Sequence, residues 1–172
     1  IRQGWWEAPS DPLDVPWTFH EAALGEPCSQ MFAWDLDQDG DSDILSASAH
    51  NFGIWWHEQS GDNAFETHLI SKAFSQTHAV ELADLDGNGL PDFITGKRFF
   101  AHNGKDPGGN DAAVLYWFEM RQDESGSPQW IPHQIDDNSG VGLQVVVEDL
   151  NGDGKLDIVS SNKKGVHCFL QL

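Results

Sequence analysis

A nine-residue acidic segment occurs three times in the chain and constrains its fold more than any other feature. The copies read DLDQDGDSD from Asp35, DLDGNGLPD from Asp84 and DLNGDGKLD from Asp149. Two further features recur with it in the same order. One is an aromatic pair (Trp5-Trp6, Trp55-Trp56, Tyr116-Trp117), and the other is a short segment that ends in histidine (His20, His68, His133). From each histidine to the next acidic segment is 15 or 16 residues. Because the three features always follow one another in the same order, they indicate one supersecondary unit that is repeated along the chain.

Each repeat has the pattern of four short strands. One strand leads into the acidic segment, an apolar run such as Asp157-Ile158-Val159 leaves it, a third carries the aromatic pair and a fourth ends in the histidine. Glycine, asparagine, aspartate and serine cluster between these runs, as turns require, and no segment has a sustained helical period. We therefore predict an all-β chain made of β-propeller blades, each with four antiparallel strands.

The spacing of these features predicts about three blades in a single propeller segment, residues 1–172. The expected boundaries are 1–22 (partial blade), 23–71 (blade), 72–136 (blade with a loop insertion at 100–113) and 137–172 (partial blade). Closed propellers have about 4–8 blades. We therefore expect a section of a larger, seven-bladed propeller, completed by the remaining blades or other domains of the same protein, or by further chains.

The acidic segments have the composition of metal loops. Carboxylates at positions 1, 3, 5 and 9 of a tight turn repel one another unless a cation lies between them. Several hard oxygen ligands favour calcium over zinc or copper. The glycines at position 6 permit the positive φ that turns backbone oxygens inward. The expected ligands of up to three calcium ions are Asp35, Asp37, Asp39 and Asp43; Asp84, Asp86, Asn88 and Asp92; and Asp149, Asn151, Asp153 and Asp157.

Two other interpretations of these loops are open to the sequence. An EF-hand requires a bidentate glutamate at position 12, where this chain has Ser46, Thr95 and Ser160. The flanking segments are also strands rather than helices, so an EF-hand is rejected. Metal-free aspartate and asparagine turns are the second alternative, because such turns are common individually. Three aligned copies favour the metal loop.

The three loops, with the strands that follow them, resemble FG-GAP/VCBS repeats, the calcium-loop blades also found in the propeller of integrin α-chains. The resemblance covers nearly the whole chain. It implies calcium in the turn between the first and second strands of each blade. Asn88 at position 5 of the second loop and Asn151 at position 3 of the third depart from the all-aspartate pattern, and fewer charges weaken a calcium site.

The opposite face of the blades carries different chemistry. In an antiparallel blade, the turns after the second strands and the starts of the first strands lie opposite the acidic loops, around the central funnel. We call this surface the funnel face. A concave polar rim suits a sugar, a uronate or a carboxylate. The expected ligand-binding residues are Gln30, His50, Asn51, His78, Lys97, Arg98, His102, Asn103, Asn162 and Lys163.

The histidines of the funnel face have two further chemical roles open to them. Imidazoles bind divalent transition metals and also serve as acid–base groups near neutral pH. His50, His78, His102 and Lys97 are therefore the candidates for catalysis, and the three histidines are candidates for an additional divalent metal. Exposed polar residues in turns are also frequently only solvated.

Composition excludes several classes of partner. The chain has 28 acidic and 9 basic residues and a net charge of −19, so we expect no nucleic-acid partner, because phosphate contacts need clustered lysine and arginine. No run approaches the ~18 apolar residues of a membrane span, so we expect no membrane insertion. The redox state of Cys28 and Cys168 stays open, because their spacing neither requires nor excludes a disulfide.

Two functions are argued from these residues, and a purely structural or adhesive repeat is a third possibility. A non-catalytic, calcium-stabilised module that binds a glycan or protein is favoured, since no complete catalytic constellation is present. The alternative is part of a metal-dependent sugar lyase. Segments 75–78 (SQTH) and 96–104 (GKRFFAHNG) are similar to propellers of aldos-2-ulose dehydratase-like enzymes. That resemblance implies dehydration of a ketosugar by a histidine base beside a divalent metal. Calcium loops predict export to the periplasm, the cell surface or the medium.

Overall fold

The computed structural model describes residues 2–61 and 64–172, which form thirteen β-strands and one short 3₁₀ turn. The first strands are β1 (Gly4–Glu7), β2 (Thr18–Glu21), β3 (Cys28–Trp34), β4 (Asp43–Ser48), β5 (Phe52–Ser60) and β6 (Ala64–Ser75). They are followed by β7 (Val80–Ala83), β8 (Asp92–Gly96), the 3₁₀ turn η1 (Ala101–Gly104), β9 (Leu115–Gln122), β10 (Pro128–Asp136), β11 (Val145–Glu148), β12 (Asp157–Asn162) and β13 (Gly165–Phe169).

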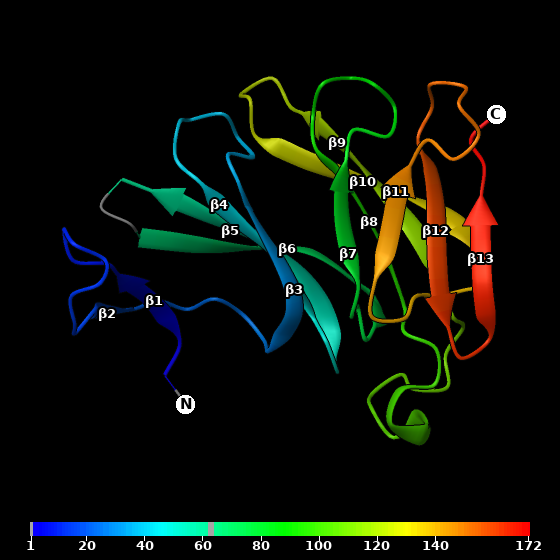
Figure 1. The fold of residues 1–172 in the computed structure, drawn as a ribbon, viewed down its shortest axis with the longest axis horizontal. Helices are drawn as coiled ribbons and strands as arrows, with labels where there is room; N and C mark the ends of the chain where they lie inside the picture. The colour runs from blue at the N-terminus through cyan, green and yellow to red at the C-terminus, as the bar shows by residue number, and fades with distance from the viewer. Residues whose placement is uncertain (1, 62–63) are drawn as a thin grey trace.

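The strands pair into four antiparallel sheets that follow the order of the chain. β1 pairs with β2, β3 to β6 and β7 to β10 form two four-stranded sheets, and β11 to β13 form a three-stranded sheet. Figure 1 shows the sheets side by side, from the N-terminal hairpin to the C-terminal sheet. Consecutive strands are neighbours in every sheet, as in propeller blades. The predicted all-β class is confirmed.

The hydrophobic core lies between neighbouring sheets. Leu45, Trp56, Phe74, Phe93 and Phe118 belong to the cluster that joins the two four-stranded sheets. A second cluster joins the β7–β10 sheet to the β11–β13 sheet and contains Ala79, Ile94, Leu115, Val141, Val145 and Ile158. The inner strands contact one another in turn, β3 with β7 and β7 with β11. Because successive side chains of a strand point to opposite faces, each sheet supplies one apolar face to each neighbour.

The topology separates the acidic segments from the insertion. The three acidic segments form the β3–β4, β7–β8 and β11–β12 loops, at the upper edge of Figure 1, whereas the insertion with η1 lies at the lower edge. Each acidic loop is closed by the same type of strand pair, Trp34 opposite Asp43, Ala83 opposite Asp92 and Glu148 opposite Asp157. The antiparallel strands therefore place the acidic loops and the insertion at opposite edges of the sheets.

The strand bounds refine the expected boundaries. β6 continues to Ser75, past residue 71, where the sequence pattern placed the end of a unit. The insertion lies between the end of β8 and the start of β9. Cys28 is half-buried, Cys168 is exposed, and both are free thiols. Within the described part of the chain, no helix is long and apolar enough to cross a membrane.

Candidate functional site

The β3–β4 loop brings three carboxylates together. One oxygen each of Asp35, Asp37 and Asp39 lie within 4.8 Å of one another. The amide of Gly40 donates to Asp35 Oδ2 (3.2 Å) and the amide of Asp39 donates to Asp37 Oδ1 (3.2 Å). Asp35 Oδ1 is buried and accepts no hydrogen bond from the described residues. Burial raises the pKa of Asp37, and the carboxylates of Asp43 and Asp39 raise it further.

The β7–β8 loop repeats this arrangement with a different third member. One oxygen each of Asp84, Asp86 and Asp92 lie within 4.8 Å of one another. Asp84 Oδ1 is buried without a partner among the described residues, as is Asp35 Oδ1. The Nδ2 of Asn88 donates to the main-chain oxygen of Met120 (3.1 Å) and to Asp86 Oδ2 (3.1 Å). The amide nitrogen at position 5 therefore ties this loop to β9.

In the β11–β12 loop, both oxygens of the first aspartate already accept hydrogen bonds from backbone amides of the same loop. Asp149 Oδ1 accepts from the amide of Gly152 (2.7 Å) and Oδ2 accepts from the amide of Gly154 (2.9 Å). These backbone hydrogen bonds lower the pKa of Asp149. Asn151 Nδ2 donates to Asp153 Oδ2 (3.0 Å). Among the described residues, carboxylates converge within 4.8 Å in the first two loops but not in this one.

The aspartate at position 9 has the same structural contacts in all three loops. Asp43, Asp92 and Asp157 are fully buried, and Oδ2 of each accepts the amide of the second residue of its loop at 2.9–3.1 Å. Oδ1 of each accepts an amide at or beyond the end of the third strand, from Gln59, Met120 and Gln171. Burial raises the pKa of Asp43 and Asp92.

The first two loops fit a calcium ion. Each has converging carboxylates and a buried oxygen, Asp35 Oδ1 or Asp84 Oδ1, that has no donor among the described residues. A buried acceptor without a partner carries a desolvation cost, which a bound cation removes. Calcium takes several oxygen ligands, including carboxylates. The third loop lacks both features, because its carboxylates are already occupied by amides.

A cluster of histidines forms on the funnel face. The His50 ring centroid lies 4.7 Å from that of His102 and 5.7 Å from that of His78. Asp106, from the insertion, accepts at Oδ2 from the Nδ1 of His102 (2.9 Å) and lies 3.4 Å from the Nδ1 of His50. His78 Nδ1 is bonded to Ser29 Oγ (2.9 Å). Burial, together with the Arg98 charge, lowers the pKa of His78.

Arg98 and Lys163 of the funnel face line a separate groove of about 330 Å³. Its lining residues are Arg98, Phe99, Gly142, Leu143, Gln144, Ser161, Asn162 and Lys163. Lys163 Nζ donates to the main-chain oxygen of Phe100 (3.0 Å), and Asn162 Nδ2 donates to that of Ser139 (2.5 Å). We call this pocket the basic groove.

Other predicted ligand-binding residues have structural contacts. Gln30 Oε1 accepts the amide of Val80 (2.8 Å). Lys97 is buried, and its Nζ donates to the main-chain oxygen of Gly109 (3.3 Å). Burial lowers the pKa of Lys97. Asn51 and Asn103 are exposed. Of the ten predicted residues, the structure brings the three histidines together in one cluster and Arg98, Asn162 and Lys163 together in the basic groove. Gln30 and Lys97 are engaged in the scaffold, and Asn51 and Asn103 lie in neither group.

Sequence reasoning missed a recurrent contact on the outer strands. His20, His68 and His133 stack on Trp5, Trp56 and Trp117 with ring centroids 4.1–4.6 Å apart. The Nε2 of each histidine also pairs with a glutamate two residues after the tryptophan, Glu7, Glu58 or Glu119, at 2.6–2.9 Å. The signal is visible in the sequence as Trp-x-Glu before each repeated histidine. Its recurrence indicates a structural contact within each sheet.

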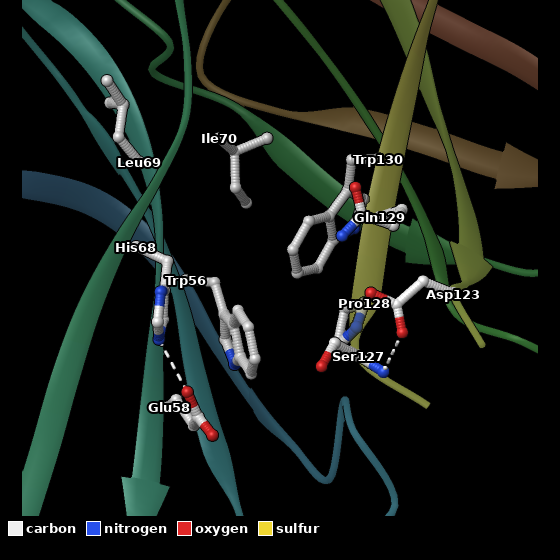
Figure 2. A pocket seen from close by; sticks show the side chains of 10 residues that line it. All are labelled: Trp56, Glu58, His68, Leu69, Ile70, Asp123, Ser127, Pro128, Gln129 and Trp130. Carbon is white, nitrogen blue, oxygen red and sulfur yellow. Dashed lines mark hydrogen bonds and ion pairs between the residues drawn. The ribbon is translucent and has the colours of Figure 1, made fainter. Parts of the chain in front are cut away.

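One copy of this contact borders a pocket between the two four-stranded sheets. Figure 2 shows Trp56, Glu58 and His68 facing Trp130 and the Asp123–Pro128 turn across it. The pocket measures about 480 Å³. The rings of Trp56 and Trp130 lie 5.7 Å apart, edge to face. Glu58 and His68 are paired with each other here as in the other sheets, so the pocket belongs to the packing of neighbouring sheets.

Comparison with known proteins agrees with the acidic loops. Residues 35–95 match the FG-GAP-like repeat. The matched span starts at the first aspartate of the β3–β4 loop and ends in β8, so it includes the two loops in which carboxylates converge. A search of curated proteins finds no match. The predicted FG-GAP resemblance is confirmed over this span, and its aspartate clusters suit a metal ion.

Proposed function

We propose that the chain is a calcium-stabilised β-propeller repeat module that binds a glycan or protein ligand on the funnel face. The β3–β4 and β7–β8 loops hold calcium, and the β11–β12 loop holds it more weakly because its carboxylates already accept backbone amides. Calcium sites of extracellular modules fill at about 10⁻⁴–10⁻³ M, so the proposal includes export from the cytoplasm.

The observation that carries the ligand proposal is the composition of the basic groove. It contains Arg98 and Lys163 but no carboxylate, in a chain with a net charge of −19. Arg98 makes no ion pair with any described residue. Gln144, Ser161 and Asn162 add amide and hydroxyl groups. This combination suits an anionic, hydroxyl-rich ligand such as a uronate-containing glycan, or an acidic segment of a protein.

The test is binding of uronate-containing and neutral glycans, and of an acidic peptide, in calcium. Arg98→Ala and Lys163→Ala should each weaken the bound anionic ligand by about 10–100-fold, because a hydrogen bond to a charged group contributes about 1.5–3 kcal/mol. Lys72→Ala is the matched control, since Lys72 is exposed on β6 away from the groove. Equal loss in all three variants, or no binding of any probe, would refute the groove as the ligand site.

A second function is supported by the histidine cluster. His50, His78 and His102 lie together beside the insertion, as a metal-dependent sugar lyase of the aldos-2-ulose dehydratase kind would require. The lowered pKa of His78 keeps its imidazole neutral and able to accept a proton. In such a dehydration, a base removes the proton from the carbon beside the carbonyl group, and a hydroxyl group leaves as water after protonation.

Turnover of anhydro- and ketosugars by the purified protein tests this second function, with His78→Ala as the control. Turnover that disappears in the variant supports a lyase. Glycan binding without turnover supports the binding module alone.

A further inference from the structure

Three potential metal ligands on the funnel face converge from two separate segments. His50 lies in the turn between β4 and β5, and His102 and Asp106 lie in the insertion. One nitrogen of each histidine and one oxygen of Asp106 lie within 4.8 Å of one another. The Nδ1 of both histidines approaches the same atom, Asp106 Oδ2, at 3.4 and 2.9 Å.

The geometry points to a transition-metal site formed by His50, His102 and Asp106. Two imidazole nitrogens and one carboxylate oxygen suit zinc, iron(II), cobalt(II) or nickel(II), whereas calcium prefers oxygen ligands only. The site rests on the funnel-face function proposed above, and it has Asp106, rather than His78, as its third ligand. The insertion that carries Asp106 lies at the edge of the sheets opposite the acidic loops (Figure 1), so this site is separate from the calcium loops.

The distances between the ligand atoms suit a single ion. With metal–ligand bonds of about 2.0–2.2 Å, adjacent ligand atoms lie about 2.9 Å apart in octahedral and about 3.4 Å apart in tetrahedral coordination. The two distances to Asp106 Oδ2 are 2.9 and 3.4 Å. Both distances are therefore compatible with a single ion held by the three side chains.

The insertion is anchored in the position that forms this cluster. Gln76 Nε2 donates to the main-chain oxygen of Pro107 (3.3 Å), and Lys97 Nζ donates to that of Gly109 (3.3 Å). A Cβ at Gly108 would lie 2.6 Å from Ser75 Oγ, so the loop packs closely against the end of β6. These contacts preorganise Asp106 beside a turn of the neighbouring sheet.

The cluster leaves room for an exogenous ligand on the metal. The side chains of His50 and His102 are 47% and 53% exposed. Three protein ligands with an open position are the usual arrangement of a catalytic zinc site. The ring of His78 lies 5.7 Å from that of His50, next to the proposed site. An oxygen-donor ligand, such as a sugar hydroxyl or a carboxylate, is the class that this site would take.

A second group in the described part of the chain, Glu58, Glu66 and His68, also brings ligand atoms within 4.8 Å. Its histidine already pairs with Glu58 at 2.6 Å and stacks on Trp56. The same pairing recurs at His20 and His133, which indicates a structural role. This group is therefore the competitor that an experiment must separate from the proposed site.

Cobalt(II) titration of the calcium-saturated protein tests the proposal, followed by the visible absorption of the coordinated ion. We expect one cobalt ion per chain, retained in excess calcium. His102→Asn and Asp106→Asn should weaken cobalt binding by at least about 10–100-fold, the loss that follows even from removing an outer-shell partner of a ligand. Asparagine tolerates the left-handed φ of 47° at position 102, so this variant should fold.

Glu66→Gln and Lys72→Ala are the controls and should leave cobalt binding unchanged, since Lys72 is exposed on β6 and belongs to neither site. Cobalt binding that is lost in Glu66→Gln but kept in His102→Asn would place the ion at the competing group and overturn the proposal. Displacement of cobalt by calcium, or no cobalt binding, would overturn it as well. Glycan binding that persists without cobalt binding refutes the metal site alone, and cobalt binding without glycan binding refutes the groove alone.

Discussion

Asp43, at the start of β4, accepts a 2.8 Å hydrogen bond at Oδ1 from the backbone amide of Gln59, near the end of the neighbouring strand β5. The equivalent contact joins Asp92 to Met120 (2.7 Å) and Asp157 to Gln171 (2.9 Å). The last carboxylate of each acidic loop therefore ties the loop to the next strand of the same sheet, near or just after the end of that strand. Its main contacts are structural, although its residue type and position also suit a calcium ligand.

Asp92→Ala should destabilise the protein by about 3–6 kcal/mol, because it removes two hydrogen bonds to a buried charged acceptor, each contributing about 1.5–3 kcal/mol. Asp92 is fully buried, so the freed amides of Leu85 and Met120 lose their partner. Urea unfolding with EGTA should show most of this loss, because these hydrogen bonds do not depend on the metal. Asp86→Asn, at an exposed loop position, is the control. A loss seen only in calcium would contradict the structural role.

Calcium removal should lower the melting temperature through the first two loops. A site at a free calcium concentration of about 100 times its Kd adds about 2.7 kcal/mol. Asp35→Asn should reduce the calcium-dependent part of stability, since Asp35 contributes to a carboxylate cluster. Asp149→Asn is the matched change in the third loop, and should lower stability with or without calcium because it disrupts amide contacts. Calorimetric unfolding in calcium and in EGTA distinguishes the two variants. An equal loss of calcium-dependent stability in Asp35→Asn and Asp149→Asn would contradict the stronger calcium site in the first loop.

Stability should decrease as the pH falls below 6.5 because of His57. This imidazole is buried between Ser46 Oγ (2.8 Å) and Thr67 Oγ1 (2.9 Å). Burial, with a smaller effect from His68, lowers its pKa from the ordinary value of 6.5. The unfolded chain then binds the proton first, so the stability present above pH 6.5 is lost progressively toward the folded-state pKa. Urea unfolding of wild type and His57→Gln across this range measures the difference, which should shrink as the pH falls. A pH-independent difference would contradict the assignment.

Glu119 should stabilise the protein only while it is ionised. Its Oε1 and Oε2 contact Arg121 Nε (2.5 Å) and His133 Nε2 (2.7 Å), and these hydrogen bonds lower its pKa below the ordinary 4.5. The stability is therefore fully present above pH 4.5 and is lost as the pH falls through the folded-state pKa. Glu119→Gln should be less stable than wild type above pH 4.5 and approach it in acid. Glu124→Gln, at an exposed position, should show no such dependence.

The acidic loops could be predicted because their chemistry is local. Asp35, Asp37 and Asp39 lie within five residues, so a short turn brings them together whatever surrounds it. The repeat of Asp84 and Asp149 at equivalent places then predicted the all-β class and the strand order. The difference between the loops was not predictable, because the free oxygen of Asp35 and the saturated carboxylate of Asp149 depend on backbone torsions within each turn.

The sequence by itself determined that acidic loops alternate with strand pairs, since that pattern depends on residue type and short spacing. Only the tertiary structure decided which polar residues of the funnel face meet. Asp106 reaches His50 across 55 intervening positions, whereas Lys97 turns inward to Gly109. These contacts depend on how the insertion packs against the neighbouring sheet. That packing is set by contacts between residues far apart in the chain, which a local sequence pattern does not specify.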